Sequence, residues 1–173
     1  FFGRIIEKSV WYYQFVVFLL KTQISLLVLI ALAIIFFNKI KSKKTVNELY
    51  LILPVLLLLF LLMFHKTTMA VSHIIPIYPF LIVFVSKVAN LKNKLVKILL
   101  VIAILHYFLS AVFAFPEYFS YFNEFVGGSR NGYKYLGGGN IDNGQNLPQL
   151  KEFMIENNIQ KINLSYLGSV DPK

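Results

Sequence analysis

The sequence predicts a mainly α-helical, polytopic membrane protein with about four transmembrane helices, followed by the start of a small extracytoplasmic α/β region. Three observations support this prediction. The chain has 173 residues, of which 57% are hydrophobic, its apolar residues are concentrated in four long runs, and many of its lysines lie between these runs. Such a composition is typical of membrane proteins. The chain contains no cysteine, so disulfides and thiol chemistry are not expected.

The four apolar runs predict helices over about 20–38, 48–65, 70–87 and 95–116. A helix needs about 20 apolar residues to cross the hydrocarbon core of a bilayer. The fourth run meets this length without help, and flanking Tyr, Thr and Lys side chains can extend the other three. Pro76-Ile77-Tyr78-Pro79 predicts that the third helix is kinked or locally unwound near its outer end. We therefore expect residues 1–116 to form the transmembrane region.

The lysines predict the orientation of these helices. Four lysines lie in the connection 38–44 and four more in 87–97, whereas the intervening connection around 65–73 has one. Short lysine-rich loops stay on the cytoplasmic side. We therefore expect a multi-pass protein of the cell membrane whose polar region 117–173 is extracytoplasmic. The net charge of +9 is then a topology signal. It predicts membrane lipid as a partner and no nucleic acid.

The region after Phe115 has a different character. Two glycine-rich stretches predict loops, and 147–156 has the apolar spacing of a short amphipathic helix with Pro148 in its first turn. The alternation over 162–166 predicts a strand, so we expect the opening of a small α/β region here. Because the chain starts at Phe1 and ends within this region, we expect a truncated piece of a longer protein.

A set of motifs follows the last apolar run. Residues 118–128 read Y-F-S-Y-F-N-E-F-V-G-G, 131–136 read N-G-Y-K-Y-L, and 140–147 read N-I-D-N-G-Q-N-L. These motifs resemble the C-terminal signature of bacterial membrane glycosyltransferases related to the protein O-mannosyltransferases (glycosyltransferase family 39). Stretches 11–22 and 72–80 resemble the same enzymes. The chain departs from the pattern in three places: an acidic residue is absent near Gly138, Asn143 replaces a tryptophan, and Asn146 replaces an aspartate.

The resemblance implies transfer of a sugar from a polyprenyl-phosphate donor to an acceptor on the outer face of the membrane. Such enzymes carry their catalytic acidic residue in a first external loop, which this chain does not contain, so no catalytic residue is assigned. Cationic and hydrogen-bonding groups at the outer helix ends would hold the phosphate leaving group. No cofactor is predicted, and the residues do not indicate a divalent metal site, although a metal is not excluded.

The candidate substrate-binding residues are polar side chains expected near the outer membrane surface: Lys21, Lys66, His73, Asn123, Glu124, Asn140, Asp142 and Gln145. Each has a structural alternative. Lys66 fits either a ligand of the donor phosphate or an interfacial lysine, and Lys21 fits either a functional charge at membrane depth or the start of the first helix. His73 also fits a structural histidine, and the spacing of Asp142 and Gln145 also fits a turn.

Two other functions are consistent with the residues. A transporter or flippase for a lipid-linked or small substrate would explain the paired prolines, because broken helices form binding sites in transporters. A non-catalytic scaffold, or a degenerate relative of the glycosyltransferases, would explain the departures at Gly138, Asn143 and Asn146.

Overall fold

The computed structural model describes residues 1–4, 10–42, 45–65 and 70–164. Lys66 and residues 165–166 of the expected strand lie outside these ranges. Within them the chain is mainly helical, and three stretches are long and apolar enough to cross a membrane: Val46–Met63, Val71–Asn90 and Lys94–Ala114. A bent helix pair at the N-terminal side would make a fourth span. The predicted mainly helical class is confirmed, and of the about four transmembrane helices expected, three to four are long and apolar enough to cross a membrane.

The first apolar run is the main difference from the expected helices. In place of one helix over 20–38, the structure has α1 (Tyr13–Lys21) and α2 (Ile24–Ile35), which meet at 111°, and then the short α3 (Phe37–Ile40). Thr22, between α1 and α2, has an extended backbone with ψ 135°. The helix breaks here because Lys-Thr-Gln interrupts the apolar run and these polar groups find partners elsewhere in the fold.

The third apolar run is unwound at one end, as its prolines predict. It consists of the 3₁₀ turns η1 (Val71–His73) and η2 (Ile75–Ile77), the helix α5 (Tyr78–Ser86) and a further 3₁₀ turn, η3 (Lys87–Asn90). Pro76 and Pro79 each occupy the first turn of an element, where a missing N–H costs least.

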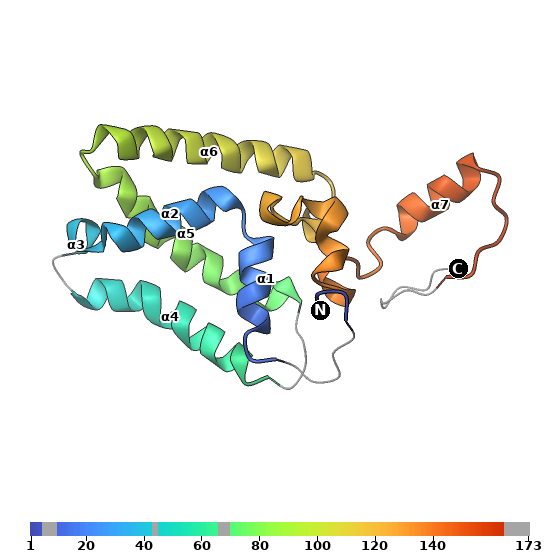
Figure 1. Cartoon of the computed structure of the whole chain (residues 1–173), viewed down its shortest axis with the longest axis horizontal. Coiled ribbons are helices and arrows are strands. Elements are labelled where there is room, and N and C mark those ends of the chain that lie inside the picture. The colour runs from blue at the N-terminus through green and yellow to red at the C-terminus, as the bar shows by residue number, and fades with distance from the viewer. Residues whose placement is uncertain (5–9, 43–44, 66–69, 165–173) are drawn as a thin grey trace.

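The helices form one bundle (Figure 1). α2 and α5 lie between α4 (Thr45–Met63) and α6 (Lys94–Ala114), with α5 packed on α4 and α2 packed on both α5 and α6. The buried residues of α6 are Val96, Ala103 and Ser110, which lie seven residues apart and form a narrow stripe. The rest of α6 exposes large apolar side chains. A narrow buried stripe on an apolar helix is what a lipid-facing helix requires, because lipid replaces the protein core around it.

The described part of the first lysine-rich connection, 38–42, lies at the same end of the bundle as the second connection (Figure 1). α3, beside the first connection, packs on η3, which begins the second. The opposite end carries the α1–α2 break and the chain after Phe115. The two connections therefore share a side, as the charge pattern requires. That this side is cytoplasmic stays a prediction.

An ion pair joins α4 to η3 at the lysine-rich end. Lys87 Nζ lies 2.8 Å from both carboxylate oxygens of Glu48, and the Ser42 backbone N–H donates to Glu48 Oε1 at 2.6 Å. Glu48 is buried, with 4% of its surface exposed. We expect Glu48→Gln to lower the free energy of unfolding by about 2 kcal/mol, because it leaves the Lys87 charge partly buried without its counter-ion. Thermal unfolding in detergent measures this, and a Lys92→Met variant at the same end of the bundle serves as the exposed control.

Residues 117–146, called here the outer segment, fold against the bundle through short 3₁₀ turns. These turns are η4 (Tyr118–Ser120), η5 (Glu124–Val126), η6 (Ser129–Lys134) and η7 (Gly138–Asn140). Phe122, Val126 and Leu136 share one hydrophobic cluster with residues of α1, η2 and α4. The outer segment is therefore part of the same folded body as the membrane helices.

A helix and a strand were predicted beyond the outer segment, and the structure has the helix. The expected helix is α7 (Leu147–Glu156), with proline in its first turn, and it projects away from the bundle (Figure 1). The expected α/β character is not found in the described part of the chain: residues 162–164 have no regular structure, and no strand occurs in the described ranges. A strand needs a partner to pair with, and alternation in one stretch does not supply one.

Candidate functional site

The motifs over 118–136 give the outer segment a compact fold. Gly127 and Gly128 have φ angles of 77° and 75°, a region that side chains other than hydrogen disfavour. A Cβ atom at Gly132 would lie 2.2 Å from Cδ2 of the buried Phe122 ring. Backbone conformation and close packing thus explain why these motif positions are glycine. The motif residues lie where the outer segment packs on α1.

Asn123 ties the outer segment to the C-terminal end of α1. Its side chain is fully buried, and Nδ2 donates to the carbonyls of Leu19 at 2.6 Å and Thr22 at 2.8 Å. Its backbone N–H donates to the Leu20 carbonyl at 3.0 Å. The last carbonyls of a helix have no partner within the helix, so Asn123 supplies the donors that stabilise the α1–α2 break.

We expect Asn123→Ala to lower the free energy of unfolding by about 1–3 kcal/mol, because buried carbonyls lose their side-chain donor. Thermal unfolding in detergent is the measurement. Asn157→Ala is the matched control, since the exposed Asn157 bonds only to the Phe153 carbonyl of its own helix. Equal stability of both variants would contradict the assigned role of Asn123.

Asn140 makes a second connection between the outer segment and the bundle. Its Nδ2 donates to the Tyr13 hydroxyl at 2.9 Å, and its Oδ1 accepts from the Val71 backbone N–H at 2.9 Å. Its backbone carbonyl accepts from Lys21 Nζ. Asn140 is 2% exposed. Every part of this residue is engaged in holding α1, η1 and η7 together.

Lys21 is a buried lysine at this end of the bundle. It is 7% exposed, and besides Asn140 its Nζ donates to the Phe119 carbonyl at 2.9 Å and lies 4.0 Å from the centre of the Phe122 ring. No carboxylate pairs with Lys21 within the described residues. A lysine ammonium has three N–H donors, and two of them are used by carbonyls. No oxygen of the described residues accepts from the third, and no described carboxylate pairs with the ammonium group.

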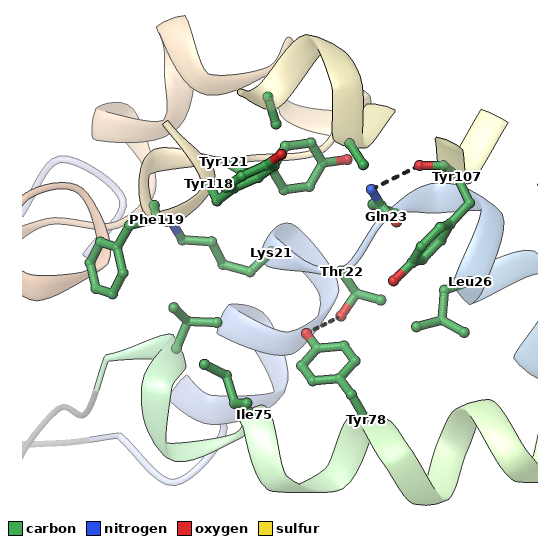
Figure 2. A pocket seen from close by; sticks show the side chains of 13 residues that line it. Lys21, Thr22, Gln23, Leu26, Ile75, Tyr78, Tyr107, Tyr118, Phe119 and Tyr121 are labelled. Atoms are coloured by element: carbon green, nitrogen blue, oxygen red, sulfur yellow. Dashed lines mark hydrogen bonds between the residues drawn. The ribbon is translucent and has the colours of Figure 1, made fainter. Parts of the chain in front are cut away.

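A cavity of about 510 Å³ adjoins Lys21 (Figure 2). Its walls come from the α1–α2 break, η1, η2 and α5, the last part of α6, and the outer segment. The lining residues are Lys21, Thr22, Gln23, Leu26, Val71, Ile75, Tyr78, Tyr107, Ala111, Ala114, Tyr118, Phe119 and Tyr121. Figure 2 shows Tyr118, Tyr121 and Phe119 on one side of Lys21 and Tyr78 with Ile75 on the other.

The polar groups of this cavity offer both donors and acceptors. Thr22 Oγ1 and the Tyr78 hydroxyl lie 2.8 Å apart, which fixes α5 against the break. Gln23 Nε2 donates to the Tyr107 carbonyl at 3.4 Å, whereas its buried Oε1 has no hydrogen-bond partner among the described residues. Donors and acceptors within one cavity suit a ligand that carries an anionic group and hydroxyls.

Tyr121 contributes a buried hydroxyl group of the outer segment to this cavity. Burial, together with the nearby charge of Glu124, raises the pKa of Tyr121 to about 12. Both causes disfavour the phenolate, so the hydroxyl stays protonated throughout the physiological pH range. It can therefore donate a hydrogen bond to a bound oxygen at any pH at which the protein works.

The other predicted residues lie elsewhere. Lys66 is outside the described residues. His73 is exposed, and its Nδ1 lies 3.2 Å from the Ala70 carbonyl. Asp142 accepts from the Gly144 N–H at 2.8 Å, and Gln145 bonds to the Ile141 carbonyl and the Asn143 N–H, so both stabilise a turn. The structure therefore does not bring the eight candidates into one pocket.

Sequence reasoning missed most of the cavity lining. Thr22 and Gln23 could have been found, because they extend the polar interruption that singled out Lys21. Tyr78, Tyr107 and Tyr121 gave no comparable signal, since tyrosines in such positions are equally typical of interfacial belts.

Comparison of the chain with protein-family models, curated proteins and solved structures found no match. Within the described residues no group of three or more His, Cys, Asp or Glu side chains lies close enough to hold a metal ion.

Proposed function

We propose that the chain is the C-terminal part of an integral membrane glycosyltransferase, which transfers a sugar from a polyprenyl-phosphate donor to an acceptor at the outer face of the membrane. The observation that carries the proposal is the buried Lys21, which has no carboxylate partner in the described chain and borders a cavity of about 510 Å³. The resemblance of the 118–147 motifs to membrane glycosyltransferases supports the same reaction.

The donor phosphate is the natural counter-ion for Lys21. A phosphate oxygen that accepts a hydrogen bond from Lys21 Nζ forms a charge-assisted hydrogen bond. Because Lys21 itself is buried, this interaction is stronger than at a surface, and it stabilises the charge that develops on the leaving phosphate. Tyr121 and the Gln23 amide oxygen then face the sugar hydroxyls with a donor and an acceptor.

The location of the cavity suits a lipid-linked donor. It lies at one end of two membrane-spanning stretches, between Val71–Tyr78 and Tyr107–Ala114. Leu26, Ile75 and Ala111 make part of its wall apolar. A donor can thus keep its polyprenyl tail in the bilayer while its phosphosugar reaches Lys21.

A transporter or flippase of lipid-linked substrates is the second candidate. It is favoured by the 111° break between α1 and α2, because broken helices line the binding sites of many transporters. The outer segment has no evident role in transport, and this places the transporter second.

The deciding experiment supplies membranes that contain the full-length protein with radiolabelled polyprenyl-phosphate sugars and follows label on endogenous acceptors. We expect transfer by the wild type and a fall of about tenfold or more in Lys21→Met, at equal protein level, since a hydrogen bond to a charged group is lost. Absence of transfer from every donor by inserted protein contradicts the proposal. Movement of the lipid-linked sugar across proteoliposome bilayers without transfer would establish the transporter.

A further inference from the structure

A second cavity, of about 410 Å³, adjoins the Lys21 cavity. Ala114 and Tyr121 line both cavities and form the wall between them. The second cavity lies where the last turns of α6 meet the outer segment. It includes Glu124, the remaining polar candidate of the motifs.

Glu124 presents a carboxylate that is only partly used. Its Oε1 accepts from Ser110 Oγ at 3.4 Å and lies 3.7 Å from His106 Nε2. Its Oε2 receives no hydrogen bond from the described residues, and half of the side chain is exposed. Glu124 therefore has a free acceptor that a ligand can reach.

Other polar groups of the cavity are also unsaturated. His106 Nδ1 is buried and has no hydrogen-bond partner among the described residues. Ser129 Oγ accepts from the Phe122 N–H at 3.3 Å, which leaves its O–H free to donate. Placing a histidine at this depth of a membrane helix costs free energy, so a binding or structural role is expected for it.

The remaining lining is aromatic and apolar, with Leu109, Phe113 and Phe122. A cavity with apolar walls and a few unsaturated polar groups is the general form of a small-molecule site. Aromatic faces beside a carboxylate and hydroxyls favour a saccharide, because its C–H faces pack on rings while its hydroxyls donate to the carboxylate. A second phosphate is disfavoured, since Glu124 would repel it.

We propose that this second cavity binds a saccharide whose hydroxyl donates to Glu124, and that it is the acceptor site. The saccharide chemistry follows from the lining, whereas the role as acceptor rests on the proposed function. Because Tyr121 and Ala114 line both cavities, an acceptor beside Glu124 would lie next to a donor beside Lys21.

The test uses the full chain in lipid nanodiscs and a photoreactive diazirine analogue of n-octyl β-D-glucoside. After irradiation, mass spectrometry maps the labelled peptides, with unlabelled octyl glucoside, methyl β-D-glucoside or 1-octanol as competitor. We expect labels within 106–129 that octyl glucoside displaces and octanol does not. We also expect Glu124→Gln to raise the competitor concentration for half-displacement about tenfold, because a charge-assisted hydrogen bond is lost.

Glu117→Gln is the matched control. It makes the same chemical change in the outer segment, but Glu117 bonds to Gln149 and lines neither cavity. Thermal unfolding of the same samples shows that each variant is folded. Displacement by methyl glucoside as well as octyl glucoside supports a site for the sugar alone, and displacement by octyl glucoside only supports a lipid-linked sugar.

Equal displacement by octanol, or unchanged displacement in Glu124→Gln, would overturn the inference, because the cavity would then be an apolar groove. The outcome is separable from that of the proposed function. Labelling that a glucoside displaces, in a protein without sugar transfer, would overturn the glycosyltransferase and leave the saccharide site. Transfer activity together with displacement by octanol would overturn the saccharide site alone.

Discussion

Replacing Lys21 with methionine is expected to raise the Kd for farnesyl phosphate by about tenfold or more and to leave the Kd for farnesol unchanged. The two probes differ only in the phosphate, which the Lys21 ammonium would hold through its free N–H. Hydrogen bonds to charged groups contribute about 1.5–3 kcal/mol, which corresponds to this loss of affinity. The measurement is equilibrium binding to the protein in nanodiscs.

Two further variants distinguish a role of the Lys21 charge in phosphate binding from a structural role of its side chain. Lys21→Arg retains the cation and is expected to keep more of the phosphate selectivity than Lys21→Met. Lys134→Met removes an exposed lysine of the outer segment, whose Nζ donates to Asn131 and which lines neither cavity. An equal loss of farnesol and farnesyl phosphate binding in Lys21→Met would mean that Lys21 only holds Phe119 and Asn140 in place.

The second large effect is expected for Gly132→Ala, which should lower the free energy of unfolding by about 3 kcal/mol. The added Cβ would lie 2.2 Å and 2.3 Å from two atoms of the Phe122 ring. That ring is 2% exposed, so it cannot turn into solvent, and overpacking a core costs about 1–3 kcal/mol or more. Because Lys21 rests on the Phe122 ring at 4.0 Å, we also expect weaker binding of farnesyl phosphate.

Gly137→Ala provides the control for this prediction. Gly137 has a φ of −132°, which any residue adopts, and nothing lies within 4 Å of an added Cβ. Combining Gly132→Ala with Phe122→Leu should recover part of the lost stability, since a smaller side chain makes room. Thermal unfolding in detergent measures the stability of the wild type, the two glycine variants and the double variant. If Gly132→Ala and Gly137→Ala were equally stable, the close packing of Gly132 on Phe122 would be refuted.

Part of the fold was predictable because it depends on short stretches of chain. The spans around 48–65 and 95–116 follow from the length of their apolar runs, since transfer to lipid is a sum over neighbouring side chains. Pro76 and Pro79 predict unwinding because a proline N–H is missing wherever the helix lies. The helix at 147–156 was predictable for the same local reasons.

The candidate site was predictable only in part. Lys21 was singled out because a charge within an apolar run is unusual, yet its partners Phe119 and Asn140 lie 98 and 119 residues away in sequence. Asn123 and Asn140 were expected as substrate ligands, but the structure engages their side chains in bonds to α1 and η1. Their amide groups have the same chemistry in either role, so composition alone does not distinguish them.

The sequence by itself determined that this chain has helices long and apolar enough to cross a membrane, which connections share a side, and where polar groups interrupt apolar runs. Only the tertiary structure decided that the first run breaks at Thr22, that Lys21 meets no carboxylate within the described chain, and that Tyr121 separates two cavities. The physical reason is the range of the interactions. Hydropathy acts through neighbouring residues, whereas the pairing of a buried polar group depends on which distant donor or acceptor the fold places beside it.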